Sequence, residues 1–165
     1  MGTWDFEAPW STTLKLVSFS ATLFLIALPV FMALEQDLPP DEMVFLAVLP
    51  IIFLGATVPF TIRGYSLSGN CLMVRRLFWT TRVDLSGLRS AKVDPDAMKG
   101  SMRTMGNGGL FSFSGHFRNK RLGSYRAFVT DQKSCVVLVT DLRTIVVSPS
   151  SPEYFVELAR SAIHE

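Results

Sequence analysis

The sequence predicts two transmembrane α-helices that form a hairpin, followed by an all-β barrel of about seven antiparallel strands capped by a C-terminal α-helix. The chain of 165 residues is 48% hydrophobic and 18% charged, whereas soluble domains usually contain roughly 25% charged residues. Two uncharged apolar runs lie in the first 62 residues, and short strand-like segments fill the rest. We therefore expect a membrane domain at 1–62 and a cytoplasmic domain at 63–165.

The two apolar runs have the length of membrane-spanning helices. No charged residue occurs from 16 to 34 or from 43 to 62. At 1.5 Å per residue these runs form helices of roughly 28–30 Å, which matches the hydrocarbon core of a bilayer. Buried core helices are a poor alternative, because the remaining residues are too few to cover them. A cleaved signal peptide is the other alternative for the first run, although no basic segment precedes it.

The charges beside the two runs predict their orientation. The connection 35–42 has four acidic residues and no Lys or Arg, whereas Lys15 precedes the first run and Arg63 follows the second. Positive residues are retained on the cytoplasmic side of a membrane. We therefore expect a multi-pass protein of the inner (plasma) membrane with both termini in the cytoplasm. The three aromatic residues of 4–10 are typical of an interfacial belt, with a frayed terminus as the alternative.

Basic charge is concentrated directly after the membrane domain. Residues 63–165 contain 15 basic and 8 acidic residues, and 63–126 alone contain 12 and 3. A basic domain held at a bilayer is attracted to anionic headgroups, which makes membrane lipids the expected partners. A solvated positive face that only orients the protein is the alternative. Nucleic acid is not an expected partner, because the sequence has no helix-turn-helix and no aromatic-and-basic strand signature.

The soluble half alternates short apolar strands with turn residues. Regular spacing of this kind is typical of an antiparallel sandwich or barrel. A final helix is predicted after Pro149, with Pro152 at its first position and Glu153 near its positive end. Its apolar residues repeat at helical spacing up to Ala162. The predicted strands are 63–68, 71–78, 80–85, 88–93, 109–114, 123–130, 134–140 and 143–147.

Five segments of this half occur together in a characteristic order: YSLSGNCLMVRR, VDLSGLRSAKV, the glycine-rich MGNGGLFSFSGHF, LGSYRAFVTD and IVVSPSSPEYFVELARSAI. The stretch from Tyr65 to Ile163 that contains them resembles the bacterial pleckstrin-homology (PH) domain family found C-terminal to a pair of membrane spans. The resemblance implies a PH-like barrel of seven strands in two orthogonal sheets, capped by the C-terminal helix, with no enzymatic activity. It fixes no ligand, because PH-like folds bind lipids, peptides or copies of themselves.

The densest basic cluster is the predicted anion or lipid site. Arg118, Lys120 and Arg121 lie among aromatic residues, and on a loop that faces the membrane they can grip phosphate oxygens. Arg103 lies beside the glycine-rich segment 105–109, which is a turn or a weak anion site. Arg76 is the fifth candidate, although Arg76 and its neighbour on the strand point to opposite faces. A plain solvated loop is the alternative for the cluster.

The sequence offers little for catalysis, metals or cofactors. Only two histidines are present, and His164 lies one residue from the end of the sequence. No nucleophile-elbow pattern accompanies them. Cys71 and Cys135 lie in strand patterns, which is typical of buried, reduced residues, and two cysteines are too few for a zinc cluster. We expect no catalytic residue, no metal site and no cofactor.

Three functions fit these observations. The first is a non-enzymatic, membrane-anchored interaction or scaffold module at the inner leaflet, with a protein partner or a homo-oligomer. The second is a sensor of anionic lipid or headgroup that acts through the basic loop, and the third is an accessory subunit of a transporter. The first two differ in whether reversing the charges of Arg118 and Lys120 abolishes selective lipid binding.

Overall fold

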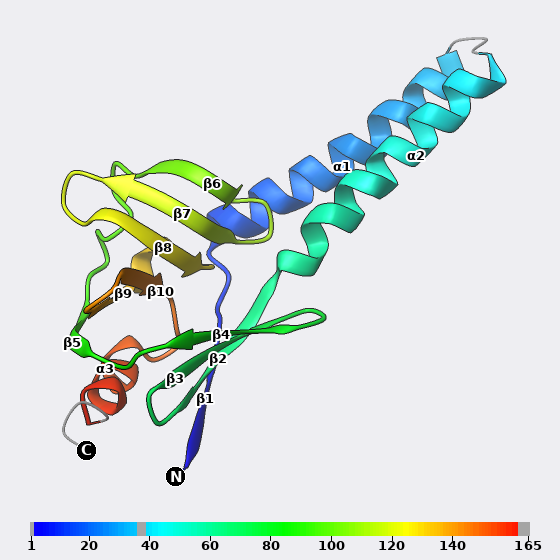
Figure 1. The fold of residues 1–165 in the computed structure, drawn as a ribbon. Helices are drawn as coiled ribbons and strands as arrows, with labels where there is room; N and C mark the ends of the chain where they lie inside the picture. Colours follow the sequence, from blue (N-terminus) through cyan, green and yellow to red (C-terminus); the bar gives the residue numbers. More distant parts are fainter. Residues whose placement is uncertain (1, 36–38, 162–165) are drawn as a thin grey trace.

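Two long helices project as a hairpin from a β-domain (Figure 1). The computed structural model describes residues 2–35 and 39–161. Helix α1 (Thr12–Glu35) leads away from the domain, and α2 (Pro40–Thr57) returns and continues into a 3₁₀ turn, η1 (Val58–Phe60). Of the predicted connection 35–42, residues 36–38 lie outside the described residues, and residues 40–42 belong to α2.

Both helices are long and apolar enough to cross a membrane, over Thr12–Leu34 and Pro40–Phe60. Only 6% of each span is buried within the protein, which is the opposite of what core helices of a soluble protein show. The helices begin three or four residues earlier than predicted. For α2 the reason is Pro40, since proline fits the first helical position, where its missing N–H is not needed.

The first sheet contains four antiparallel strands, β1 (Thr3–Glu7), β2 (Ile62–Ser68), β3 (Cys71–Arg76) and β4 (Thr80–Asp84), in the order β1-β2-β3-β4. Strand β1 precedes the helices, yet it pairs with β2 over its whole length. Phe6 of β1 is therefore buried at 5% exposure in the core. An interfacial belt or a frayed terminus is wrong for this residue, because strand pairing places it between the sheets.

The second sheet has six strands in the order β5-β9-β10-β8-β7-β6. Strands β8 and β10 pair in parallel, and the other pairs are antiparallel. The strands are β5 (Leu88–Val93), β6 (Met102–Gly108), β7 (Phe113–Asn119), β8 (Gly123–Val129), β9 (Val136–Thr140) and β10 (Thr144–Val147).

The sheets confirm a PH-like arrangement of strands with a C-terminal helix, but they form a sandwich and not a closed barrel. Within the described residues no strand of one sheet is hydrogen-bonded to a strand of the other, and ten strands occur where about seven were expected. The glycine-rich segment that reads as a turn belongs largely to β6, and the predicted strand 109–114 shifts to β7. Glycine is common in turns, so the sequence of β6 resembles a turn. In the structure, Gly106 of β6 pairs with Gly115 of β7.

The main core lies between the two sheets and is closed by α3 (Pro152–Ser161). Phe155 and Ala159 of α3 are buried there, as the helical spacing predicted, whereas Ala162 lies outside the described residues. Tyr65 ties the sheets together, because its hydroxyl donates to the carbonyl oxygen of Phe128 over 2.7 Å. Burial raises the pKa of Tyr65 to about 12. This hydrogen bond fixes the end of β8, which forms part of the site described next.

Candidate functional site

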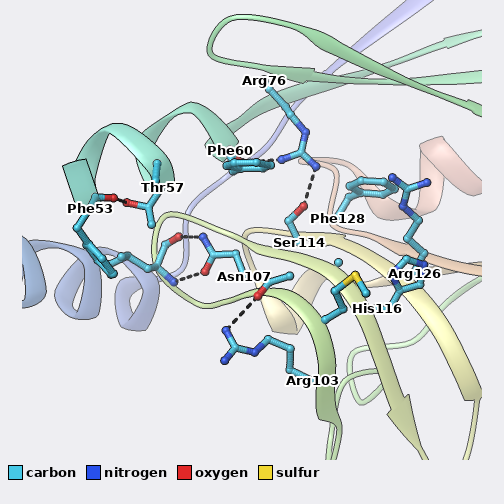
Figure 2. A pocket seen from close by; sticks show the side chains of 15 residues that line it. Phe53, Thr57, Phe60, Arg76, Arg103, Asn107, Ser114, His116, Arg126 and Phe128 are labelled. Atoms are coloured by element: carbon cyan, nitrogen blue, oxygen red, sulfur yellow. Dashed lines mark hydrogen bonds between the residues drawn. The ribbon is translucent and has the colours of Figure 1, made fainter. Parts of the chain in front are cut away.

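A cavity of about 500 Å³ lies between the end of α2 and the inner face of strands β6, β7 and β8 (Figure 2). We call it the junction pocket, because it lies where the helical hairpin meets the β-domain. One side of it is apolar, and the other carries positive charge and hydrogen-bonding groups. The apolar side is formed by Phe53, Ala56, Phe60, Met105, Leu110 and Phe128. The polar side is formed by Arg76, Arg103, Asn107, Ser114, His116 and Arg126.

Arg76 is the most deeply placed charge of the pocket, at 8% exposure. Its guanidinium donates to the carbonyl oxygen of Phe60 over 2.9 Å and to Ser114 Oγ over 2.7 Å. A third hydrogen bond runs from Nε to Thr81 Oγ1 at 3.2 Å. Figure 2 shows the guanidinium between the rings of Phe60 and Phe128, whose centroids lie 5.4 and 5.5 Å from its central carbon. Arg76 thus joins the end of α2 to β7.

These partners of Arg76 are all neutral. No carboxylate lies within ion-pair distance of Arg76 in the part of the chain that the structure describes. Burial, and to a smaller extent the charge of Arg126, lowers the pKa of Arg76. An arginine seldom loses its proton, so the direction of the shift shows that the site disfavours a bare cation. A bound anion would relieve this cost.

Arg126 brings a second positive charge to the same pocket from β8. Its side chain is half-buried and lies over the ring of Phe128, 4.8 Å from the centroid. Among the described residues its guanidinium forms no hydrogen bond and no ion pair. Burial, followed by the charge of Arg143, lowers the pKa of Arg126. Arg126 therefore presents unused donors to the pocket.

Two polar residues of β6 and β7 complete the charged side. His116 pairs in register with Arg126, which places it on the same face of the sheet. Arg103 is exposed at the rim and donates to the carbonyl oxygen of Gly106 over 3.1 Å. Gly106 and Gly115 let the two strands approach, because a Cβ on Gly115 would overlap the backbone of β6. Gly115 also has a φ of 142°, which other residues rarely adopt.

The loop between β6 and β7 fixes this strand pair to α1. Asn107 Oδ1 accepts from the backbone N–H of Leu110 over 3.1 Å, which closes the loop. The N–H of Phe111 then donates to Ser18 Oγ of α1 over 2.9 Å, and the Phe111 ring lies 6.3 Å from that of Trp10. Helix α2 therefore lines the junction pocket, and α1 contacts the loop that contributes Leu110 to it.

The structure divides the five residues that the sequence singled out. Arg76 and Arg103 lie at the junction pocket. Arg118, Lys120 and Arg121, which we call the distal group, lie near the end of β7 and in the turn that leads to β8. Strand β8 leads from this turn to Thr130, whose carbonyl oxygen accepts from the N–H of Ser11 directly before α1. The distal group therefore lies at the end of the sheet opposite to the helices.

The charges of the distal group are exposed, and one of them is paired. Arg121 donates to the carboxylate of Asp94 over 2.7 Å and to the carbonyl oxygen of Asp96 over 3.0 Å. Asp94 is largely buried, with 10% of its side chain exposed, and also accepts from the N–H of Asp96. Arg121 thus has an acidic partner, whereas the described part of the chain offers none to Arg76 or Arg126.

The sequence indicates neither Arg126 nor the apolar wall from α2 as part of a site, whereas His116 is the first residue of the basic cluster 116–121. Strand alternation in SYRAFV does place Arg126 on the face of Phe128, and this signal was available. The position of α2 above this strand gives no such signal, because it depends on contacts between segments that are distant in the sequence. The pocket therefore becomes visible only when the chain is folded.

One comparison with known proteins gives a match. A family model described as "Bacterial PH domain" matches residues 63–163. No curated protein and no solved structure matches the chain. The matched range excludes β1, α1 and α2, so the strand that completes the first sheet and the pocket wall from α2 lie outside it.

Proposed function

Since the chain belongs to the bacterial PH domain family, which is generally non-enzymatic, we propose that it is a membrane-anchored PH-like module that binds an anionic, phosphate-bearing amphiphile in the junction pocket. The expected ligand is a lipid headgroup with part of its glycerol and acyl region. The phosphate would contact Arg76 and Arg126, and Arg103 would contribute at the rim. The apolar wall from Phe53 and Phe60 would receive the non-polar part.

The observation that carries this proposal is a pair of arginines in a half-apolar cavity at the end of α2, neither of which has an acidic partner among the described residues. Guanidinium groups recognise phosphate through two parallel hydrogen bonds. Buried cations without a counter-charge are costly, and an anion that enters the pocket removes that cost. The pocket lies beside the end of a candidate span, which is the level at which a membrane presents phosphate groups.

The proposal includes the orientation that the sequence predicts. Helices α1 and α2 would cross the inner membrane, and the β-domain and both termini would lie in the cytoplasm, since Lys15 and Arg63 flank the domain side of the spans. Cysteine accessibility from the two sides of sealed vesicles tests this. Labelling of a cysteine in the β-domain from the outer side would contradict it.

The binding experiment uses the full chain in a zwitterionic detergent. Three probes are titrated separately: short-chain phosphatidylglycerol, phosphatidylcholine of the same chain length, and inorganic phosphate. Two variants are compared, Arg126→Gln in the pocket and Arg118→Gln in the distal group. Arg118 is a matched control, because it is an exposed arginine on the same face of the same sheet, at the next outward pair of strand positions.

Phosphatidylglycerol is expected to bind more tightly than phosphatidylcholine, and inorganic phosphate to bind weakly. Arg126→Gln is expected to reduce the affinity for phosphatidylglycerol by about tenfold or more, because a hydrogen bond to a charged group contributes about 1.5–3 kcal/mol. Arg118→Gln is expected to leave it unchanged. Equal losses in both variants, or no preference for the anionic lipid, would contradict binding in the pocket.

A protein partner is the second candidate function, because β6 is an edge strand that exposes two large apolar side chains. Met102 and Met105 are 75% and 70% exposed, and an edge strand can pair with a strand from a partner or from a second copy. A register shift between Arg103 and Met105 interrupts the strand, and such bulges make edges less able to pair. This function therefore ranks second.

Cross-linking in native membranes tests the second candidate. A defined adduct that is lost on Met105→Lys, but is kept on Leu142→Lys in an exposed turn, would support it. Recovery of the monomer alone, both in membranes and by native mass in detergent, would contradict it.

A further inference from the structure

The connection between β3 and β4 carries three consecutive apolar residues at its tip, the half-buried Leu77 and the exposed Phe78 and Trp79. The N–H of Arg76 donates to the carbonyl oxygen of Trp79 over 2.8 Å, which closes the turn. Phe78 is 75% exposed and Trp79 is 40% exposed. Turns between strands are usually polar, because they face water. An apolar tip of this kind indicates a non-aqueous partner.

The tip lies at the level where the second candidate span ends. The ring of Trp79 packs edge-on against that of Phe60, with the centroids 5.2 Å apart, and Phe60 is the last residue of the span Pro40–Phe60. This span has 21 residues and a length of roughly 32 Å, so all of it is needed to cross a hydrocarbon core of about 30 Å. Phe60 and Trp79 must then lie at the membrane boundary.

Basic side chains flank the tip on the domain side. A cavity of about 440 Å³ beside it is lined by Arg63, Arg75 and Arg76 together with 77–80. Arg63 is exposed and has no acidic partner among the described residues. It lies at a register shift of β2, between Ile62 and Gly64. Arg75 lies 3.4 Å from the exposed Asp5. Aromatic residues with adjacent arginines are typical of membrane interfaces.

We infer that the β3–β4 tip inserts into the boundary between headgroups and acyl chains of the same membrane that α1 and α2 cross. Phe78 would enter the apolar layer, Trp79 would lie at its boundary, and Arg63 would contact anionic headgroups. In Figure 1 the tip reaches beyond the rest of its sheet on the side of the helical hairpin. The tip would then be a third contact of the protein with the membrane, beside α1 and α2. Three contacts would fix the orientation of the β-domain relative to the membrane.

This inference rests on the membrane anchoring in the proposed function, but not on the ligand of the junction pocket. The experiment therefore needs separate reporters for the anchor and for the tip. A background with Trp4→Phe, Trp10→Phe and Trp79→Phe has no tryptophan of its own. Single reporters are then introduced as Phe24→Trp in α1, Phe78→Trp at the tip, and Leu142→Trp in the β9–β10 turn.

Leu142 is a matched control for Phe78. Both are apolar residues at hairpin tips, with 83% and 75% exposure. Leu142 lies at the opposite end of the domain, because β10 begins beside the start of β8 and therefore on the side of the distal group. Phe24 is 62% exposed on the first span and reports the anchor alone.

The full chain is reconstituted in vesicles of phosphatidylcholine and phosphatidylglycerol with acyl chains brominated near the headgroup. Bromine quenches tryptophan on contact, and iodide in the buffer quenches tryptophan that faces water. We expect bromolipid to quench Phe78→Trp several-fold more than Leu142→Trp, and iodide to give the reverse order. Quenching of Phe24→Trp by lipids with bromine at mid-chain shows that the helices are inserted.

Two results would overturn the inference while the anchoring stands. In the first, Phe24→Trp is quenched by lipid, but Phe78→Trp responds to iodide as strongly as Leu142→Trp. In the second, Phe78→Trp responds to neither quencher, which means that protein covers the tip. Failure of Phe24→Trp to respond to lipid would instead overturn the anchoring itself, and the inference with it.

A second reporter avoids the loss of Trp79, in case the triple background does not fold. Phe78→Cys and Leu142→Cys are labelled with a small fluorophore in a Cys71→Ser chain that keeps its natural tryptophans. Cys135 is fully buried, and burial raises its pKa to about 12, so it stays unlabelled. The same quenching order is expected, and equal responses from the two labels would contradict the insertion of the tip.

Discussion

Similar basic residues lie near the two ends of the six-stranded sheet, in different surroundings. At the junction pocket, Arg76 and Arg126 are buried or half-buried, lie against aromatic rings, and have no acidic partner among the described residues. At the other end, Arg121 is paired with Asp94, and Arg118 is exposed to solvent. A phosphate ligand gains most where cations are desolvated and unpaired, because solvent screens exposed charges. The number of basic residues in a segment therefore does not measure its capacity to bind anions.

Arg76 shows how a cation can be buried before any ligand arrives. Its donors reach one backbone carbonyl oxygen and two hydroxyls, and three aromatic rings surround it. These contacts offset part of the cost of dehydration while they leave the positive charge uncompensated. Ser114 and the carbonyl oxygen of Phe60 hold the guanidinium in position, as the proposed anion site requires.

The largest effect is expected from Arg76→Met. The unbranched thioether can fill much of the space, but three hydrogen bonds and the cation–π contacts are lost. We expect the free energy of unfolding to fall by about 2 kcal/mol, which corresponds to a thermal midpoint lower by about 4–8 °C for a chain of this size. Thermal melting in detergent measures this change. A thermal midpoint equal to or above that of the natural protein would contradict this expectation. It would mean that the free energy of burying the charge is at least as large as the stabilisation from its contacts.

Tyr65→Phe tests whether the pocket depends on the link between the two sheets. The hydroxyl bonds to Phe128, a wall of the pocket, and its loss should lower the free energy of unfolding at neutral pH by about 1–1.5 kcal/mol. Because the pKa of Tyr65 is about 12 in the folded state and 10 as its ordinary value, the unfolded chain ionises first as pH rises. The natural protein should therefore lose roughly 3 kcal/mol of stability between pH 10 and 12.

The same variant supplies the control for this pH dependence. Phenylalanine does not titrate, so the alkaline loss that comes from Tyr65 should be absent in Tyr65→Phe, while the contribution of the buried Cys135 is the same in both chains. Chemical unfolding of both proteins at pH 8, 10 and 12 measures the difference. Identical slopes against pH would contradict the assignment of this loss to Tyr65.

Local patterns predicted much of the fold, and contacts between distant segments account for what was missed. The uncharged runs predicted both long helices, and the spacing of Phe155 and Ala159 predicted α3. Strand β1 was missed because it is only five residues long and its partner follows 54 residues after it ends, beyond both helices. Strand β6 was missed because Gly106 and Gly108 resemble turn residues when the partner strand is not known.

The candidate site was predictable only in part for the same reason. Basic residues in a cluster predicted an anion site at 118–121, but the sequence does not reveal that Asp94 lies against Arg121. Arg76 was found because it is basic and close to the membrane segment. Arg126 stands alone between Tyr125 and Ala127 in the sequence, and only the fold brings it to the ring of Phe128 and to the end of α2.

Asp94→Asn tests the distal end by removing the acidic partner of Arg121. The amide oxygen can still accept from the N–H of Asp96, so only the charge interaction is lost. We expect the free energy of unfolding to fall by about 0.5–1 kcal/mol, as is usual for pairs near the surface, and this loss to shrink at high salt. Affinity for phosphatidylglycerol should stay unchanged, and a loss of affinity would show that the two ends are coupled.

The smallest effect is expected from reversing two charges of the distal group, Arg118→Glu with Lys120→Glu. Both side chains are exposed and neither forms an ion pair among the described residues, so stability should change by less than about 0.5 kcal/mol. The sequence predicts that the distal group recognises lipid headgroups. If it does, the double variant should lose selective lipid binding. The geometry of the junction pocket requires instead that phosphatidylglycerol bind the double variant as tightly as the natural protein. Lipid titration of this variant beside Arg126→Gln therefore decides which end of the sheet binds the anion.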